Sequence, residues 1–174
     1  SAIAYVLVYL EIEEQLTGFG GAADYVYMSS GSKGQAGLIL ASKARQHRTH
    51  IAGICARPDP GRAALTATIA NDAAAKLGLD LRLEAAEVDN DDRFSKERDD
   101  DLSPGCFEAI SLGARHEGLM FDPVYTGRAV EGMIAHIREG RLPKHSRVVF
   151  IHTGGSPSLF AFEDALRPYL HRRP

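Results

Sequence analysis

The chain has 174 residues, of which 44% are hydrophobic, so it is long enough to bury one sizeable core. A total of 20 basic and 23 acidic side chains gives a net charge of -3, which argues against nucleic acid or an anionic membrane as partner and favours a small soluble ligand. Its two cysteines, Cys55 and Cys106, have neither CxxC spacing nor a nearby histidine pair, which predicts a reduced, cytosolic compartment and no structural metal.

The first element is a predicted helix. Residues 2–16 are apolar in a pattern broad enough to indicate burial on much of the helix circumference, with Ser1 as the N-cap. The run from Ala2 to Leu10 has no basic region before it and leads directly into Glu11, unlike a signal peptide, and no stretch is long enough to span a membrane. A cytosolic protein rarely begins inside a core helix, so we expect a fragment, a processed product or one half of a split protein.

Strands and helices alternate along the rest of the chain. The predicted strands are 24–29, 49–56, 81–88 and 147–152, and the predicted helices are 35–47, 61–77, 104–116, about 127–139 and one after Gly155. The strand at 81–88 has the weakest pattern, and the charged residues 89–101 predict an exposed loop. This alternation predicts a single three-layer α/β domain over 1–174, with a mainly parallel sheet and helices on both faces.

Two strand-to-helix connections are rich in glycine. They are SSGSKGQAGL, residues 29–38, and HTGGSPSLF, residues 152–160. Such loops gather at the carboxyl edge of a parallel sheet, where backbone amides and a helix N-terminus favour an anion such as phosphate. Lys33 does not make the first loop a nucleotide-hydrolase loop, because GxxxxGK[ST] is absent. A tight connection without a ligand is the alternative interpretation of either loop.

Three segments together resemble one enzyme family. The string EGLMFDPVYTGRAVEGMIAHIREGRLPKHSRVVFIHTGGSPSLFAF, from Glu117 to Phe162, is similar to the closing segment of the D-cysteine desulfhydrase and 1-aminocyclopropane-1-carboxylate (ACC) deaminase family, where EG, DPVY[TE]GKA and FIHTGG recur in this order. The string SSGSKGQAGL resembles that family's TGSGGTQAGL phosphate loop at the same relative place. The resemblance therefore covers nearly the whole chain.

This resemblance implies a pyridoxal-phosphate (PLP) enzyme of fold type II, whose cofactor lies between two α/β domains with its phosphate in a Gly-rich loop. Tyr125 matches the family tyrosine near cofactor and substrate, and is implied to act as an acid or base. Thr126 or Thr153 is implied to approach the pyridine nitrogen. The cofactor-binding residues carried over by position are Ser29, Ser30, Gly31, Ser32, Lys33, Gly34, Thr126, Thr153 and Gly154.

The residue after Tyr125 distinguishes two branches of the family. Desulfhydrases resemble DPVYTGK and ACC deaminases DPVYEGK, and this chain has Thr126. A hydroxyl leaves the pyridine nitrogen largely unprotonated, whereas a carboxylate keeps it charged and deepens the electron sink. The resemblance thus favours β-elimination from a small amino acid such as D-cysteine, giving pyruvate, ammonia and sulfide. ACC deamination is the alternative.

The chain also departs from the family pattern. The lysine that binds the cofactor covalently lies in an N-terminal portion of the family proteins, and nothing here aligns with it among Lys33, Lys43, Lys76, Lys96 and Lys144. We therefore expect the chain to correspond to the C-terminal half and to be inactive alone. A complementing N-terminal half or a homodimer is the expected partner.

Two further departures keep other interpretations open. Residues 99–102 stand where the family has a YG[IV]P-like string with a second tyrosine, and Lys33 stands where it has a loop glycine. The Lys33 side chain must either point away from the phosphate or neutralise it. A degenerate relative without catalysis and an unrelated nucleotide-binding α/β module are the remaining hypotheses.

Overall fold

A computed structural model describes residues 1–99 and 101–170. The helices are α1 (Ala2–Thr17), α2 (Lys33–Ala44), α3 (Arg62–Lys76), α4 (Pro104–Leu112), α5 (Thr126–Arg138) and α6 (Glu163–Leu170). The strands are β1 (Tyr25–Ser30), β2 (His50–Cys55), β3 (Asp89–Asp91) and β4 (Val148–Ile151). Short 3-10 helices cover Ala85–Glu87 and Ser156–Phe162, and a π-helical turn covers Gly113–Glu117.

The four strands form one parallel sheet in the order β3-β2-β1-β4. Tyr25 at the start of β1 is in register with His50 on one side and Val148 on the other. Because every strand runs the same way, the segments that follow the strands all leave from one edge of the sheet. The sequence prediction of an α/β fold with a parallel sheet is confirmed.

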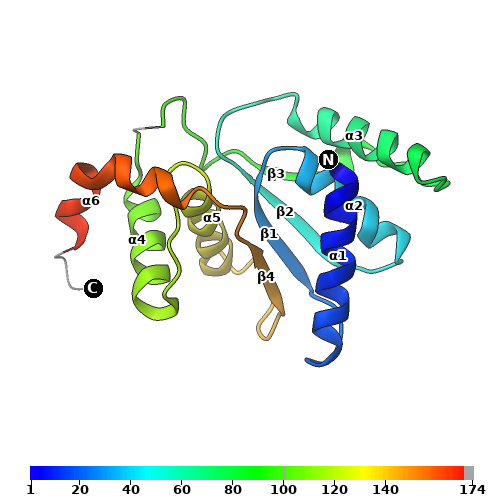
Figure 1. Ribbon diagram of the computed structural model, residues 1–174, viewed down its shortest axis with the longest axis horizontal. Coiled ribbons are helices and arrows are strands. Elements are labelled where there is room, and N and C mark those ends of the chain that lie inside the picture. Colours follow the sequence, from blue (N-terminus) through cyan, green and yellow to red (C-terminus); the bar gives the residue numbers. More distant parts are fainter. Residues whose placement is uncertain (100, 171–174) are drawn as a thin grey trace.

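Helices cover both faces of this sheet, as Figure 1 shows, with α1, α2 and α3 on one side and α4 and α5 on the other. The alternation along β1 matches these layers. Val26 and Met28 pack into the cluster that contains α2 and α3, whereas Tyr27 packs with Ala129 of α5. The predicted three layers are therefore present.

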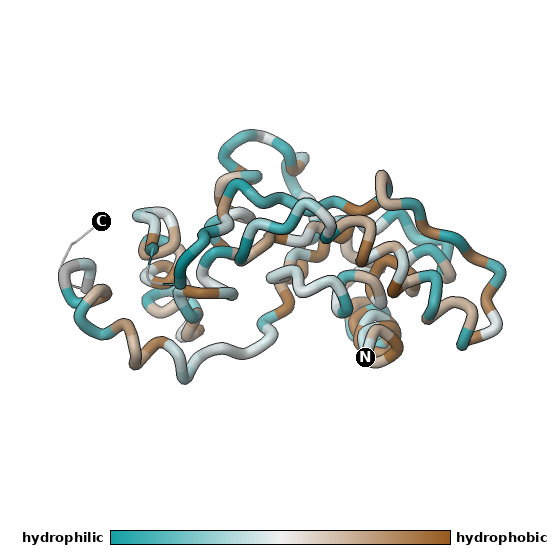
Figure 2. Tube along the Cα trace, turned by 90° about the horizontal axis from the view of Figure 1, so that it is seen from above, coloured by the Kyte–Doolittle hydropathy of each residue, from teal (hydrophilic) through white to brown (hydrophobic). Residues whose placement is uncertain are grey.

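A further apolar cluster joins α4, α5 and α6 on the outer side of the molecule. The ring of Phe107 in α4 stacks on that of Tyr169 in α6, with centroids 3.8 Å apart. Figures 1 and 2 both show α6 at the end of the molecule remote from α3. Within the described residues, no helix combines the length and apolar composition that a membrane crossing requires.

The predicted burial of the first helix is only partly correct. One face of α1 packs on α2, where Gly37 permits contact: a Cβ at Gly37 would lie 2.1 Å from the Ala2 carbonyl oxygen. Tyr9 is buried, but Leu7 is 64% exposed. The helix is the outermost of its layer, so its second apolar side has no neighbour among the described residues.

The predicted strand at 81–88 is wrong. Residues 81–84 are irregular, and Ala85–Glu87 form a 3-10 turn. Side chains, not a neighbouring strand, satisfy this backbone: Asn71 accepts from the Leu83 amide at 2.8 Å and donates to the Leu83 carbonyl at 3.0 Å. A local capping arrangement between Glu84 and the 3-10 turn then ends the segment.

The charged segment 89–101 is not wholly an exposed loop, because its first three residues form the edge strand β3. Charges are tolerated there because they have partners. The Asp89 carboxylate lies 2.6 Å from His50 Nε2, and this hydrogen bond lowers the pKa of Asp89. Polar pairing thus replaced the apolar pattern that identifies most strands.

β4 is less buried than its apolar sequence suggests. All four of its residues are only partly buried, since β4 is the edge strand next to β1. Other boundaries lie within a few residues of those predicted. The predicted helix 104–116 is the exception in form, because it ends as α4 at Leu112 and continues as a π-helical turn.

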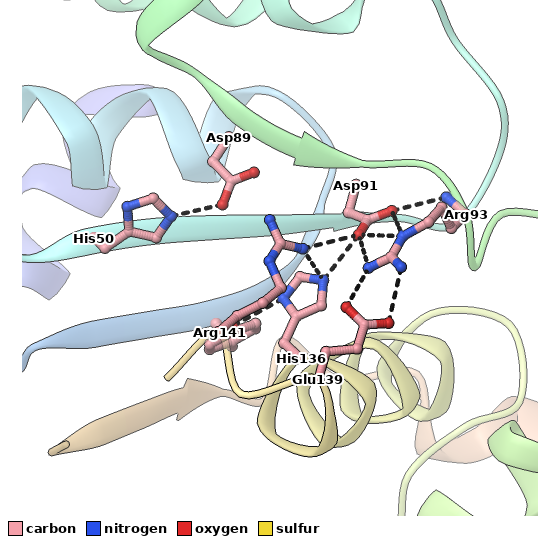
Figure 3. A network of polar contacts seen from close by, with 8 residues as sticks. His50, Asp89, Asp91, Arg93, His136, Glu139 and Arg141 are labelled. Atoms are coloured by element: carbon pink, nitrogen blue, oxygen red, sulfur yellow. Dashed lines mark hydrogen bonds and ion pairs between the residues drawn. The ribbon is translucent and has the colours of Figure 1, made fainter. Parts of the chain in front are cut away.

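A buried polar network fixes α5 against β1 and β3 (Figure 3). His136 of α5 is 1% exposed, and its Nδ1 lies 2.9 Å from the hydroxyl of Tyr27 in β1. Its Nε2 lies 2.8 Å from Asp91 Oδ2 and 2.6 Å from Arg141 Nη1. A carboxylate only accepts and a guanidinium only donates. The histidine tautomer therefore determines whether Nε2 donates a hydrogen bond to Asp91 or accepts one from Arg141.

Arg93 closes this network on its solvent side. Its guanidinium binds the Asp91 carboxylate and, at 2.9 Å, the Glu139 carboxylate. Burial raises the pKa of Asp91, but hydrogen bonds from Arg93 and His136 outweigh it and bring the pKa to about 2. Burial also raises the pKa of Tyr27 to about 12. At neutral pH the network therefore contains an ionised aspartate and a protonated tyrosine.

Candidate functional site

A cavity of about 490 Å³ opens at the carboxyl edge of the sheet. It lies between the end of β1, the start of α2, the segment from β2 to α3, the turn before α5 and the loop after β4. Its lining residues are Ser1, Tyr5, Met28, Ser29, Ser30, Gly31, Lys33, Gly34, Ala56, Arg57, Arg62, Tyr125 and Thr153. This volume is typical of small-molecule sites, and the place is where ligands bind in parallel α/β sheets.

The loop after β1 makes a tight γ-turn. The Lys33 amide donates to the Gly31 carbonyl at 2.9 Å, and the Ser32 between them has φ 66 and ψ -57. This conformation is rare and strained for a residue with a side chain. The turn redirects the chain from the strand into α2 within a single residue.

The first turn of α2 leaves backbone amides for a ligand. Of the amides there, that of Lys33 donates within the γ-turn and that of Ala36 donates to the Ser32 carbonyl. The amides of Gly34 and Gln35 precede any possible intrahelical acceptor, and they donate to no backbone carbonyl among the described residues. A Cβ at Gly31 would meet nothing within 4 Å, so open space lies beside the loop.

Gln35 anchors this helix start to the sheet. Its side chain is fully buried, accepts from the Ser30 hydroxyl at 2.7 Å and donates to the Asp89 carbonyl at 2.7 Å. A Cβ at Gly53 of β2 would lie 2.4 Å from Gln35 Oε1, so only glycine leaves room for the amide. The Ser30 hydroxyl is thus occupied by Gln35.

Tyr125 reaches the cavity from the turn before α5. Asp122 builds this turn: its fully buried carboxylate accepts from the amides of Val124, Tyr125 and Thr126 at 2.8 to 2.9 Å. Tyr125 itself is 49% exposed, and its hydroxyl has no hydrogen bond to the described residues. Asp122 therefore positions a tyrosine whose hydroxyl is available to a ligand.

The two predicted threonines differ in placement. The hydroxyl of Thr126 is fully buried, donates to Asp122 Oδ1 at 2.7 Å and accepts from the Asp122 amide at 2.8 Å. Thr153 is exposed and lines the cavity. Of these two threonines, only Thr153 offers its hydroxyl to a ligand in the present arrangement.

The loop after β4 is held by His152. Its Nε2 lies 3.0 Å from the Met120 carbonyl and its Nδ1 accepts from the Gly154 amide at 3.2 Å, which assigns the proton to Nε2. Gly155 has φ 93, and a Cβ there would lie 2.5 Å from Asp122 Oδ1. The Gly pair therefore lets this loop cross closely over the Asp122 turn.

The structure brings most of the predicted residues together. Seven of them share the cavity: Ser29, Ser30, Gly31, Lys33, Gly34, Tyr125 and Thr153. Ser32, Thr126 and Gly154 are not among its lining residues. The first loop and the tyrosine, 92 positions apart from Lys33 to Tyr125, thus face one space.

Sequence analysis missed several residues of this region. Arg57 and Arg62 line the cavity, although neither lies in a recognised motif. Arg128, 1% exposed, donates to the carbonyls of Ala56, Pro123 and Asp99, and so ties the end of β2 to the turn that carries Tyr125. The positions of these residues follow from the fold, since their partners are distant in sequence.

Neither cysteine is part of the site. Both are free and buried, and burial raises the pKa of Cys55 to about 11 and that of Cys106 to about 12. Over residues 1–99 and 101–170, no group of three or more His, Cys, Asp or Glu is placed to hold a metal ion.

Comparison with known families identifies the chain. The family of pyridoxal-phosphate dependent enzymes matches residues 2–154, and the chain belongs to this family. Its fold is that of the ACC deaminase homologue whose crystal structure is known, with a TM-score of 0.80 over 96% of this chain and 49% of that one, at 23% identity.

Individual relatives within this family are ACC deaminases. The chain is 35% identical over 161 residues to a 1-aminocyclopropane-1-carboxylate deaminase of Ralstonia nicotianae, covering 90% of this chain and 47% of the relative. It is 36% identical over 155 residues to the same enzyme of Burkholderia multivorans, covering 87% and 46%. The chain thus spans about half the length of the relatives it matches.

PLP is the cofactor of this family, and the cavity fits it. A phosphate dianion suits the free first-turn amides and the side chains of Lys33 and Arg62. No Asp or Glu is among the lining residues, so nothing there repels an anion. Arg62 Nε is buried without a hydrogen-bond partner among the described residues, as expected of a donor that awaits an acceptor.

Proposed function

We propose that the chain is the C-terminal, phosphate-binding part of a PLP-dependent lyase or deaminase that acts on a small amino acid. The observation that carries this proposal is the single cavity shared by the loop from Ser29 to Gly34, Tyr125 and Thr153. These segments are distant in sequence, and an incidental Gly-rich turn would have no reason to face the tyrosine.

Each residue has a proposed role. The amides of Gly34 and Gln35 bind the phosphate at the positive end of α2. Thr153 Oγ1 contacts the ring nitrogen, and Tyr125 Oη exchanges a proton with the substrate. When bound, the cofactor supplies the electron sink that stabilises negative charge at the substrate α-carbon.

The reaction we favour is β-elimination from D-cysteine or a similar amino acid, giving pyruvate, ammonia and sulfide. A hydroxyl at Thr153 and the lack of a lining carboxylate suit a ring nitrogen that is not held protonated. Thr126 would support the same preference only if its hydroxyl exchanged Asp122 for the ring nitrogen.

ACC deamination is the second candidate. The observation in its favour is that the relatives at 35% and 36% identity are named as ACC deaminases. The two candidates differ in product, because elimination from cysteine leaves a three-carbon 2-oxo acid and opening of the ACC ring leaves a four-carbon one. Product analysis therefore separates them directly.

We propose that a complementing N-terminal half supplies the lysine that binds the cofactor covalently. A homodimer of this chain alone would bring only a second copy of the same five lysines. Lys33 is the one lysine among the lining residues, and it begins α2, whose first-turn amides would hold the phosphate. Its position suits contact with phosphate oxygens, not with the aldehyde at the other end of the cofactor.

The test is to titrate the chain with PLP and follow the absorbance of the bound cofactor. We expect saturable binding, no covalent attachment after borohydride reduction, and turnover once a separately expressed N-terminal half is added. The family match excludes the hypothesis of an unrelated nucleotide-binding module. Absence of PLP binding would instead support a degenerate relative without catalysis. Attachment at Lys33, located by mass spectrometry, would refute the assignment of the lysine to another segment.

A further inference from the structure

The cavity carries more positive charge than a loop of backbone amides requires. Lys33, Arg57 and Arg62 all line it, and none of its lining residues is acidic. Backbone amides and one helix terminus already form a phosphate site in many proteins. The three cations therefore need a separate explanation, and their surroundings differ.

Arg62 is held firmly beside the phosphate loop. Its Nη1 donates to the carbonyl of Ser30, the residue at which β1 ends, and its Nη2 donates to the carbonyl of Arg57, both at 3.3 Å. Its Nη2 also forms a long ion pair with Asp59 Oδ2, at 3.5 Å. The side chain is 15% exposed, and Nε is buried without a partner among the described residues. The guanidinium is thus fixed in place with donor capacity unused.

Lys33 differs in being exposed, and its ammonium group forms no ion pair or hydrogen bond with the described residues. It follows the γ-turn at Ser32 directly, so its backbone position is well defined. Arg57 is the opposite case, because its guanidinium is already bound to Asp99 Oδ1 at 2.7 Å and to the Glu97 carbonyl at 2.8 Å.

We propose that Lys33 and Arg62 form a cationic clamp that recognises the phosphate monoester of the ligand in addition to the loop amides. This inference rests on the proposed function for the identity of that ligand. Arg62 lies on the α3 side of the loop and Lys33 at the start of α2, so the dianion is held from two elements. Arg57 is outside the clamp because its guanidinium is tightly bound, by Asp99 at 2.7 Å and the Glu97 carbonyl at 2.8 Å, whereas the ion pair of Arg62 with Asp59 is 3.5 Å long.

The clamp is tested with pyridoxine 5′-phosphate, which has the phosphate but no aldehyde and so cannot attach covalently. Dissociation constants are measured by equilibrium dialysis for this compound, for pyridoxine and for inorganic phosphate. We expect Lys33→Gln and Arg62→Gln each to weaken binding of the two phosphate compounds by about tenfold or more, as for loss of a charge-assisted hydrogen bond. Pyridoxine binding should not change.

Matched variants isolate the effect of position from that of net charge. Arg82→Gln removes an exposed arginine that pairs with Glu84 away from the cavity, and it should bind as the parent chain does. Arg62→Lys keeps the charge and should retain more affinity than Arg62→Gln. Raising the salt concentration should weaken phosphate binding more in the parent chain than in Lys33→Gln.

The outcomes distinguish the clamp from the proposed function. If PLP binds but both Gln variants hold pyridoxine 5′-phosphate as tightly as the parent chain, the clamp is refuted and the function stands. If the variants weaken inorganic phosphate but PLP binds no better than phosphate alone, the clamp stands and the function fails. If no phosphate compound binds, the clamp is refuted. Lys33 is exposed, so its variant answers the question even if Arg62→Gln unfolds.

Discussion

Two polar clusters of this protein have opposite properties. Around His136, each charged group has a partner, and Asp91 is bound by Arg93 and His136 within a closed network (Figure 3). In the cavity, the Tyr125 hydroxyl and the Lys33 ammonium bind no other group in the described part of the chain, and Arg62 Nε is buried without a hydrogen-bond partner there. Complete pairing fixes architecture, whereas incomplete pairing marks the place where a ligand completes the structure.

The sharpest way to break this comparison is to remove the centre of the closed network. Asp91→Ala leaves His136 and Arg93 without their shared acceptor, and we expect a loss of about 3 kcal/mol of unfolding free energy. Urea denaturation measures it. The control is Asp92→Ala, because the Asp92 side chain is exposed and binds no other side chain among the described residues. This change should alter stability by about 0.5 kcal/mol at most. Equal effects of both changes would show that the network contributes nothing specific.

The open cluster should respond in the opposite manner. Tyr125→Phe removes only a hydroxyl that no described residue binds, so the thermal unfolding midpoint should stay unchanged. Turnover of the enzyme reconstituted with its other half should fall by about a hundredfold, the scale of general acid or base catalysis. A large drop in stability with normal turnover would reverse the roles of the two clusters.

Acid should reveal the closed network as well. The pKa of Asp91 is about 2 in the fold, below the roughly 3.9 of an unstructured aspartate. Its contribution is therefore complete above about pH 4 and is lost as the pH falls through about 2. Urea midpoints measured from pH 5 to pH 2.5 should decline more steeply for the parent chain than for Asp91→Asn. Parallel curves would contradict the assignment.

The smallest effect concerns the thiols, which belong to neither cluster. Because burial raises the pKa of Cys55 to about 11 and of Cys106 to about 12, both remain thiols at pH 8. Alkylation by iodoacetamide should be slower than in the urea-unfolded chain by about a hundredfold or more. Rapid labelling of the folded chain at either position would show that the surrounding core opens readily.

The sequence predicted the layers and the parallel sheet because apolar runs such as 49–56 mark buried strands. It could not predict β3, since Asp89 and Asp91 are stabilised there by His50 and His136, which are distant in sequence. The strand that it predicted at 81–88 does not form, because the backbone of Leu83 is bound by the side chain of Asn71 and not by a neighbouring strand. Periodicity reports apolar burial and is insensitive to polar pairing.

The same distinction applies to the site. The Gly-rich loop and Tyr125 were identified from motifs that resemble a known family, whereas Arg62 was not, because its importance depends on the approach of α3 to the end of β1. Asp122 belongs to the DPVYT motif, but the sequence assigned it no role. Its role in the turn became clear only from the structure, in which its carboxylate accepts hydrogen bonds from three backbone amides.

The hydrogen bonds of Arg128 determine which positions around it can tolerate substitution. Its guanidinium is satisfied by main-chain carbonyls, including those of Ala56, Pro123 and Asp99, and those oxygens are present whatever amino acid occupies the position. Substitutions at its partners therefore leave the contacts in place, whereas replacement of Arg128 itself would release several segments at once. The partner positions should thus tolerate substitution, whereas Arg128 should not.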